Sequence, residues 1–206
     1  MMMNNSGFDL WADGYDKSVG VSDEENVYPF AGYKKVMNRI FGEVMEHGDA
    51  KVLDIGFGTA TLAKRLYDNG CTVFGQDFSR RMIEIAAEKM PGAHLYEGDF
   101  SKVLCSEFLE HRYDFIVSTY ALHHLDDAQK IDFINGLLPL LNDCGKILIG
   151  DVAFMTRSEL EKCENDAGSE WDGDEIYFVF DEIKEHFPKM CFEQMSYCSG
   201  VLTLRK

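Results

Sequence analysis

The sequence lacks an excess of positive charge and a long apolar run, and each absence excludes a class of protein. Its 206 residues carry a formal charge of −16, whereas nucleic-acid binders and proteins on anionic membranes need a basic face. No stretch approaches the roughly 18 apolar residues that span a membrane. The N-terminus has no basic residue before Lys17 and no apolar run, so we expect no signal peptide. We therefore predict neither a nucleic-acid nor a membrane partner.

Paired cysteines are also missing. The six cysteines form no CxxC pair and no zinc-binding spacing, which predicts a reduced, cytoplasmic protein without a metal-ligand cluster. The hydrophobic fraction of 46% and the aromatic fraction of 13% are enough for a core, so we expect one domain, or one domain with a lid. The oligomeric state is left open.

Apolar segments that favour strands alternate with segments of helical periodicity. The expected strands cover residues 51–57, 71–78, 94–100, 112–120 and 145–152. A first expected helix starts near Lys34. Further helices are expected from about Thr59 to Asn69, from Ser79 to Pro91 and over 101–110. Another follows Asp126, and Pro139 shortens its pattern. Residues 190–198 and 201–206 predict a hairpin with its turn at Ser199–Gly200. The pattern favours a doubly wound, Rossmann-like α/β fold with a mostly parallel seven-stranded sheet and an antiparallel hairpin at one edge.

A glycine-rich turn follows the first strand in VLDIGFGTATLAKRL, residues 52–66, and a carboxylate stands just before it. Asp54, Asp77 and Asp99 come at the ends of the first three strands. The carboxyl ends of parallel strands meet at one edge of a sheet. We therefore expect three carboxylates along one crevice. Each also has a simpler reading: a plain strand-to-helix turn at the glycines, a helix cap at Asp77 and an ordinary turn at Asp99.

The charge at this turn favours a cationic ligand. Two unit charges about 6 Å apart interact by about 3 kcal/mol at an effective dielectric near 20, so Asp54 would repel a pyrophosphate. S-adenosylmethionine (SAM) is cationic and has no phosphate. Asp77 follows Gly56 by 77 − 56 = 21 residues, the place of a ribose-binding acid. Thr61 stands where the third glycine of the NAD fingerprint belongs, which disfavours, without excluding, a nicotinamide-dependent oxidoreductase.

DIGFGTA (54–60) resembles the first motif of class I SAM-dependent methyltransferases, [D/E]xGxGxG, with Ala60 in place of the last glycine. QDFS (76–79), GDF (98–100) and STYALHHL (118–125) follow in the order and spacing of that family. The chain is most similar to small uncharacterised bacterial methyltransferases that open with a W…YD element, here Trp11, Tyr15 and Asp16. The resemblance implies SAM as cofactor, S-adenosylhomocysteine (SAH) as product, and in-line SN2 transfer of the methyl group to a small-molecule acceptor.

The resemblance also implies roles for individual residues. Cofactor contacts are expected from Asp54, Gly56 and Gly58 at the methionine end, Asp77 at the ribose, and Phe78, Asp99 and Phe100 at the adenine. Ser118, Thr119 and Tyr120 are expected near the transferred methyl group. Tyr15 either closes over the cofactor or serves as a packed brace.

His123 and His124 allow two interpretations. His123, nearer the strand end, is the candidate general base, with Tyr120 beside it; otherwise LHHL is a packing turn. A base is needed only where the acceptor must lose a proton, and a non-catalytic SAM or SAH binder stays an alternative.

The resemblance implies a lid and amphipathic helix in residues 1–47 and the SAM-binding methyltransferase domain in 48–206. An acidic substrate lid is expected near 155–188, because residues 157–193 hold twelve acidic and four basic side chains, a net charge of −8. This segment favours a neutral or cationic acceptor.

Overall fold

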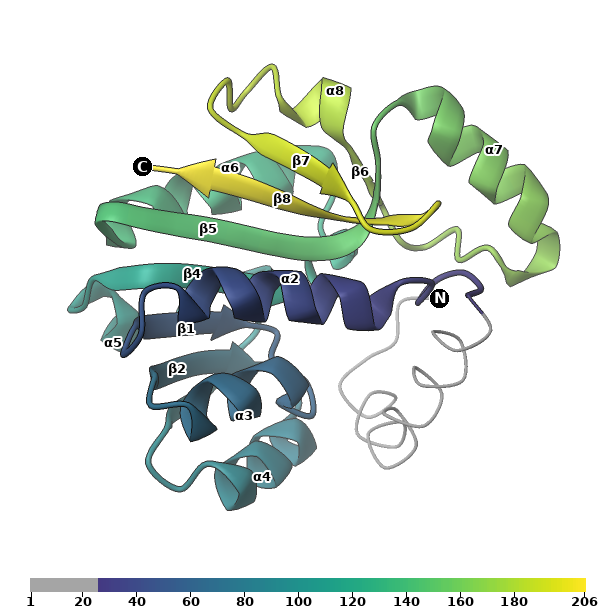
Figure 1. The fold of residues 1–206 in the computed structure, drawn as a ribbon. Helices are drawn as coiled ribbons and strands as arrows, with labels where there is room; N and C mark the ends of the chain where they lie inside the picture. Colours follow the sequence, from purple (N-terminus) through teal and green to yellow (C-terminus); the bar gives the residue numbers. More distant parts are fainter. Residues whose placement is uncertain (1–25) are drawn as a thin grey trace.

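A mostly parallel sheet forms the centre of the computed structural model, which describes residues 26–206 (Figure 1). Its strands are β1 (Lys51–Ile55), β2 (Thr72–Asp77), β3 (His94–Glu97), β4 (Tyr113–Thr119), β5 (Leu141–Phe154), β6 (Phe178–Val179), β7 (Cys191–Gln194) and β8 (Ser199–Arg205). Their order is β3-β2-β1-β4-β5-β8-β7, and the short β6 pairs with β5. Only the pairs that β8 makes with β5 and with β7 are antiparallel among the described strands. The predicted α/β fold class is confirmed.

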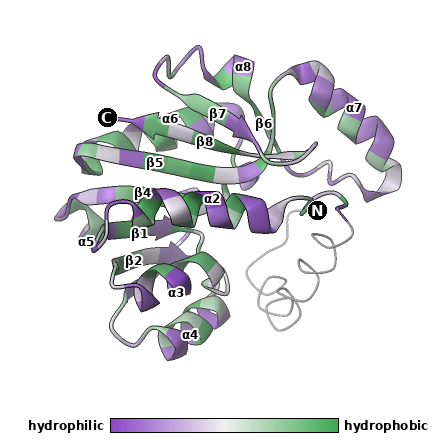
Figure 2. Ribbon diagram, viewed as in Figure 1, coloured by the Kyte–Doolittle hydropathy of each residue, from purple (hydrophilic) through white to green (hydrophobic). Residues whose placement is uncertain are grey.

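Helices cover both faces of this sheet. They are α2 (Tyr33–Met45), α3 (Thr61–Asp68), α4 (Arg80–Lys89), α5 (Ser106–Leu109), α6 (Asp127–Leu137), α7 (Arg157–Ala167) and α8 (Phe180–Ile183). One apolar cluster joins α2, α3, α4 and α7 to the sheet, and a second joins α5, α6 and α8 to its other face. Figure 2 shows the central strands as mainly hydrophobic and α7 as mainly hydrophilic. Such burial on both faces explains the near-continuous apolar runs of the strands.

Local signals set the ends of two of these helices. The Ser79 side chain accepts a hydrogen bond from the Met82 N–H and caps α4. Asp126 and Gln129 form a reciprocal capping box at the start of α6. Helix α6 ends at Leu137, and a 3₁₀ turn over Leu138–Leu140 takes up Pro139, as expected for a residue without a backbone N–H.

The segment after β3 differs from the prediction. The expected strand over 94–100 ends at Glu97, and the expected helix over 101–110 is only α5. Asp99 accepts hydrogen bonds from the N–H and hydroxyl of Ser101, so the chain forms a side-chain-stabilised turn there. This turn ends the strand early and delays the helix.

The hairpin turn is also displaced from its predicted position. Ser199 and Gly200 lie inside β8, and the turn covers residues 195–198. The Ser196 hydroxyl accepts from the N–H groups of Cys198 and Ser199 and thereby stabilises the turn. A Cβ at Gly200 would lie 2.2 Å from the Phe192 ring, so this glycine permits close packing between strands. The sheet also has one strand more than the predicted seven, the two-residue β6.

No helix within residues 26–206 has both the length and the apolar character needed to cross a membrane.

Candidate cofactor and active site

A cleft of about 760 Å³ opens at the carboxyl ends of the parallel strands. The predicted site residues that line it are Gly56, Gly58, Asp77, Phe78, Asp99, Phe100, Thr119, Tyr120 and His123. Asp54 and Ser118 are buried beneath it. Tyr15, with the rest of the W…YD element, lies outside the described residues. The topology thus gathers nine of the predicted positions around one cavity.

The glycine-rich turn needs left-handed backbone at three alternate positions. Gly56, Gly58 and Ala60 have φ values of 69°, 54° and 63°. A Cβ on Gly56 would stand 2.5 Å from the Ala121 Cβ, so this position needs glycine for space as well as for conformation. Ala60 keeps the conformation that the family motif gives to glycine, which costs an alanine roughly 1–2 kcal/mol. The turn therefore has the backbone path of the motif, with strain at its third position.

Asp54 is a buried carboxyl group beneath this turn. The residue is 1% exposed, and its Oδ1 has no hydrogen-bond partner among the described residues. Burial, together with the nearby charge of Asp77, raises the pKa of Asp54 to about 8. A buried carboxyl with an unsatisfied oxygen gains from a cationic neighbour, so this site fits a ligand that carries positive charge.

Asp77 and Asp99 use their carboxylates to shape the cleft. Asp77 accepts hydrogen bonds from the N–H groups of Gly58 and Ser79, both at 2.9 Å, and so ties the end of β2 to the glycine turn. Asp99 pairs with Lys102 at 2.8 Å. Partial burial raises the pKa of Asp99, but the hydrogen bonds from Lys102 and Ser101 outweigh it, so the net pKa lies below its usual value.

Residues at the end of β4 and just after it either support the glycine turn or form the cavity wall. The Ser118 hydroxyl donates to the Ile55 carbonyl at 2.9 Å and so joins β4 to β1 beneath the glycine turn. Tyr120 has a φ of 50°, which is strained for a bulky residue, and its N–H donates to the Gly150 carbonyl at 2.8 Å. Burial, with the charge of Asp151, raises the pKa of Tyr120 well above its usual value. Tyr120 is therefore a neutral wall of the cleft.

His123 is held between two carboxylates. Its Nδ1 lies 2.7 Å from Asp151 Oδ1, and its Nε2 lies 3.4 Å from Glu175 Oε1. Burial by itself lowers the pKa of His123, but the charges of Asp151 and Glu175 outweigh it, and the net pKa is raised. Asp151, 1% exposed in β5, also accepts from the Val152 N–H and is fixed in place. The Asp151–His123 contact orients Nε2 outward from the sheet.

Glu175 is a site residue that the sequence prediction missed. It lies in the segment after α7, lines the cleft, and accepts a hydrogen bond from the Tyr177 hydroxyl at 2.7 Å. The Ile176 N–H donates to the His123 carbonyl at 2.8 Å, and the buried Lys130 ammonium donates to the Ile176 carbonyl at 2.6 Å. These bonds hold the segment against the turn that carries His123.

The far end of the cleft is acidic. Four carboxylate residues of the segment after α7 line it, namely Glu170, Asp172, Asp174 and Glu175. With Asp77 and Asp99 they make six, and the described lining residues include no Lys or Arg. The acidic run between 157 and 193 was the sequence signal for this rim, although the sequence did not indicate which of its carboxylates face inward.

Comparisons with known proteins support these assignments at the level of the family. Residues 52–145 match the family described as a methyltransferase domain. An uncharacterised methyltransferase of Anoxybacillus flavithermus is 38% identical over 154 residues, which cover 75% of this chain and 69% of the relative. One from Alkaliphilus oremlandii is 30% identical over 183 residues, 89% of this chain and 81% of the relative. The chain belongs to this family of bacterial methyltransferases. The predicted family is confirmed.

Solved methyltransferase structures share the fold. A DhpI–SAM–HEP complex has a TM-score of 0.69 at 17% identity and covers 98% of this chain and 95% of that one. The N-methyltransferase NodS of Bradyrhizobium japonicum, in complex with SAH, has a TM-score of 0.64 at 12% identity and covers 95% and 97%. The small RNA methyltransferase HEN1 has a TM-score of 0.65 at 16% identity and covers 84% of this chain and 25% of that one. These neighbours agree with SAM as the cofactor, and their differing substrates leave the acceptor of this methyltransferase open.

Proposed function

We propose that this methyltransferase moves the methyl group of SAM to a small neutral or cationic acceptor. One observation carries the proposal: a single cleft joins the glycine turn and Asp77 at one end to His123 and an acidic rim at the other. The cleft is large enough for a cofactor and a small acceptor together.

The cofactor end fits SAM through its charges and its backbone. Gly56 and Gly58 allow the backbone to approach the methionine part closely, and the buried Asp54 stabilises its positive charge. Asp77 lines the cleft at the end of β2, where its carboxylate is a suitable acceptor for the ribose hydroxyls. Phe78 and Phe100 provide the apolar walls for the adenine, and Asp99 accepts from its amino group.

The acceptor end is assigned to His123, Tyr120 and the rim. Bound SAM supplies an electrophilic methyl group, and an in-line nucleophile attacks its carbon with the sulfur as the leaving group. His123 Nε2 accepts the proton of the nucleophile while Asp151 holds the other ring nitrogen. Tyr120 packs against Phe30 and Tyr33 and excludes water from the reacting groups.

The first experiment is isothermal calorimetry of the purified protein with SAM, SAH and NAD. We expect binding of SAM and SAH and none of NAD. Binding of NAD in place of SAM would contradict the charge argument at Asp54.

The second experiment screens acceptors by release of SAH, with amines, neutral thiols and alcohols, carboxylates, phosphates and short RNA as separate sets. Turnover of amines or neutral compounds supports the proposal, whereas methylation of anionic acids or RNA alone contradicts it. A protein that binds SAM and methylates none of these sets is a SAM-binding protein without this activity.

His123→Gln is expected to keep SAM affinity and to lose roughly 10²–10⁴-fold in turnover. His186→Gln, an exposed histidine outside the cleft, is the matched control.

A further inference from the structure

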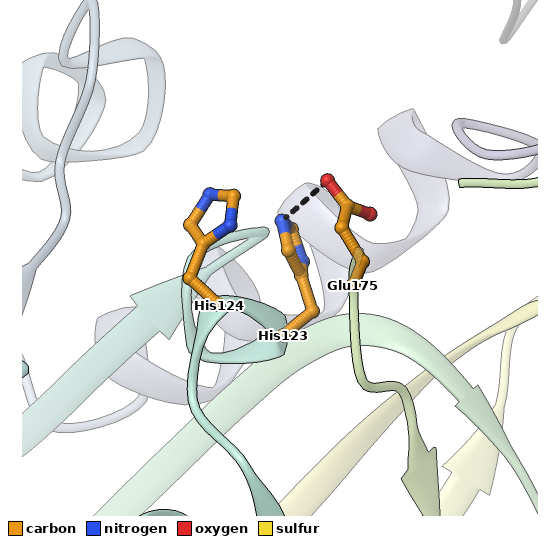
Figure 3. A group of neighbouring side chains, drawn as sticks. All are labelled: His123, His124 and Glu175. Carbon is orange, nitrogen blue, oxygen red and sulfur yellow. Dashed lines mark ion pairs between the residues drawn. The ribbon is translucent and has the colours of Figure 1, made fainter. Parts of the chain in front are cut away.

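Three side chains of the types that bind metals meet at the acceptor end of the cleft. His123 and His124 come from the 3₁₀ turn after β4, and Glu175 comes from the segment after α7 (Figure 3). One ligand atom from each lies within 4.8 Å of the others. All three residues line the cleft. The group therefore joins two distant parts of the chain at one accessible point.

The spacing inside this group matches a coordination sphere. His123 Nε2 and Glu175 Oε1 are 3.4 Å apart, which is long for a hydrogen bond. Two ligands each about 2.1 Å from a zinc ion, at tetrahedral positions, are roughly 3.4 Å apart. One edge of such a site is therefore already formed, and only the His124 ring has to approach.

Outer contacts orient these ligands as in known metal sites. Histidine ligands usually donate their second ring N–H to a carboxylate, and Asp151 occupies this place for His123 at 2.7 Å. The Tyr177 hydroxyl donates to Glu175 Oε2 and leaves Oε1 for a cation. Asp151 is 1% exposed, and among the described residues its ion pair is with His123. This arrangement presents Nε2 as the ligand nitrogen.

Charge and donor type favour a cation of the zinc class. Two imidazoles and one carboxylate suit Zn²⁺, Co²⁺ and similar ions better than Mg²⁺ or Ca²⁺, which prefer oxygen ligands. Asp172 and Asp174 line the same part of the cleft and add negative charge. Three protein ligands leave a fourth position open, as in catalytic zinc sites.

We infer that His123, His124 and Glu175 bind a divalent cation of the zinc class at the acceptor end of the cleft. Its role rests on the proposed methyl transfer, but its binding does not. The open position takes the hydroxyl or thiol group of the acceptor, whose proton leaves to water. The oxygen or sulfur then binds the cation through one lone pair and keeps another for the methyl group. Nε2 then coordinates and no longer serves as a base, so the cation replaces it in activating the nucleophile.

The test uses the chelator-treated full chain, titrated with Zn²⁺ by calorimetry and with Co²⁺ by visible absorption. We expect one bound ion per chain and the intense visible bands of four-coordinate Co²⁺. Glu175→Gln and His124→Gln should each weaken Zn²⁺ binding at least tenfold and abolish those bands. Asp151→Asn, which changes the outer shell, should weaken it roughly 10–100-fold.

His186→Gln and Glu170→Gln are the matched controls, one outside the cleft and one on its rim. SAM titration and circular dichroism of each variant show that the fold and the cofactor end are intact. The inference is overturned if the parent protein does not bind Zn²⁺. It is also overturned if Glu175→Gln and His124→Gln bind Zn²⁺ as tightly as the two controls. Since these readouts need no acceptor, a failed acceptor screen would contradict the proposed function and leave the cation site standing.

Discussion

Replacing Asp54 by asparagine tests the charge logic beneath the glycine turn. The pKa of this buried carboxyl lies at about 8 in the folded protein, against an ordinary value of 3.8. Between these two pH values the unfolded chain has lost the proton and the folded chain keeps it. The folded state therefore binds more protons, and its stability falls as the pH rises through this window.

The magnitude follows from one proton of difference between the two states. The free energy of unfolding falls by up to about 1.4 kcal/mol per pH unit, or about 3 kcal/mol between pH 5 and pH 7. Asp54→Asn does not ionise, so the variant should lack this contribution. Its melting temperature should rise relative to the parent protein by about 2–4 °C for each kcal/mol gained.

Asp54→Asn should weaken SAM binding although it stabilises the fold. A carboxylate about 6 Å from the sulfonium attracts it by about 3 kcal/mol. Because the pKa of Asp54 is about 8, ionising it at pH 7 costs about 1.4 kcal/mol, which offsets about half of that attraction. Asp54→Asn should therefore weaken SAM roughly tenfold. The number of protons exchanged on binding, measured by calorimetry in buffers of different ionisation enthalpy, should differ between the two proteins.

The assay is thermal or urea unfolding at pH 5, 6, 7 and 8, with SAM titrations at each pH. Parallel stability profiles for the two proteins, together with equal SAM affinities, would refute the assignment of Asp54 as the cationic partner. A stabilised variant with unchanged affinity would confine Asp54 to stability alone.

Two further predictions concern the same turn. Gly56→Ala should abolish SAM binding, because the φ of this position is 69° and the new Cβ would stand 2.5 Å from the Ala121 Cβ. Gly58→Ala is the milder control, because a Cβ there meets nothing within 4 Å. Equal losses of SAM affinity in calorimetry would contradict the steric argument. Ala60→Gly should raise the free energy of unfolding by about 0.5–1 kcal/mol, because it relieves an alanine at φ 63°, and urea unfolding that shows no gain would remove the strain from this position.

The sequence was sufficient for the framework because the framework depends on local and periodic signals. The buried strands appear as apolar runs, and Ser79 and Asp126 mark the starts of α4 and α6. The glycine turn was recognisable because left-handed backbone restricts residue choice at Gly56 and Gly58. The family and the fold class follow from these signals, which also predict where the cofactor binds.

The acceptor end depended on contacts between distant segments, which a single sequence does not encode in readable form. Asp151 was predicted only as part of the strand over 145–152, and its pairing with His123 follows from the register of β5 beside β4. Glu175 was one of many acidic residues, and the Ile176 N–H bond to the His123 carbonyl brings it inward. The hairpin error at Gly200 has the same origin, because the Phe192 ring across the strand pair requires that glycine.

The acidic lining of the cleft has a consequence for product release. The sulfur of SAM is positively charged, whereas the sulfur of SAH is neutral. Under the proposed function, the six carboxylate residues around the cleft attract incoming SAM, and this attraction weakens in the step that moves the methyl group. A loss of even 1.4 kcal/mol of attraction speeds departure about tenfold. Under the same proposal, methyl transfer removes the positive charge from the cofactor, so that the cleft binds SAM in preference to SAH.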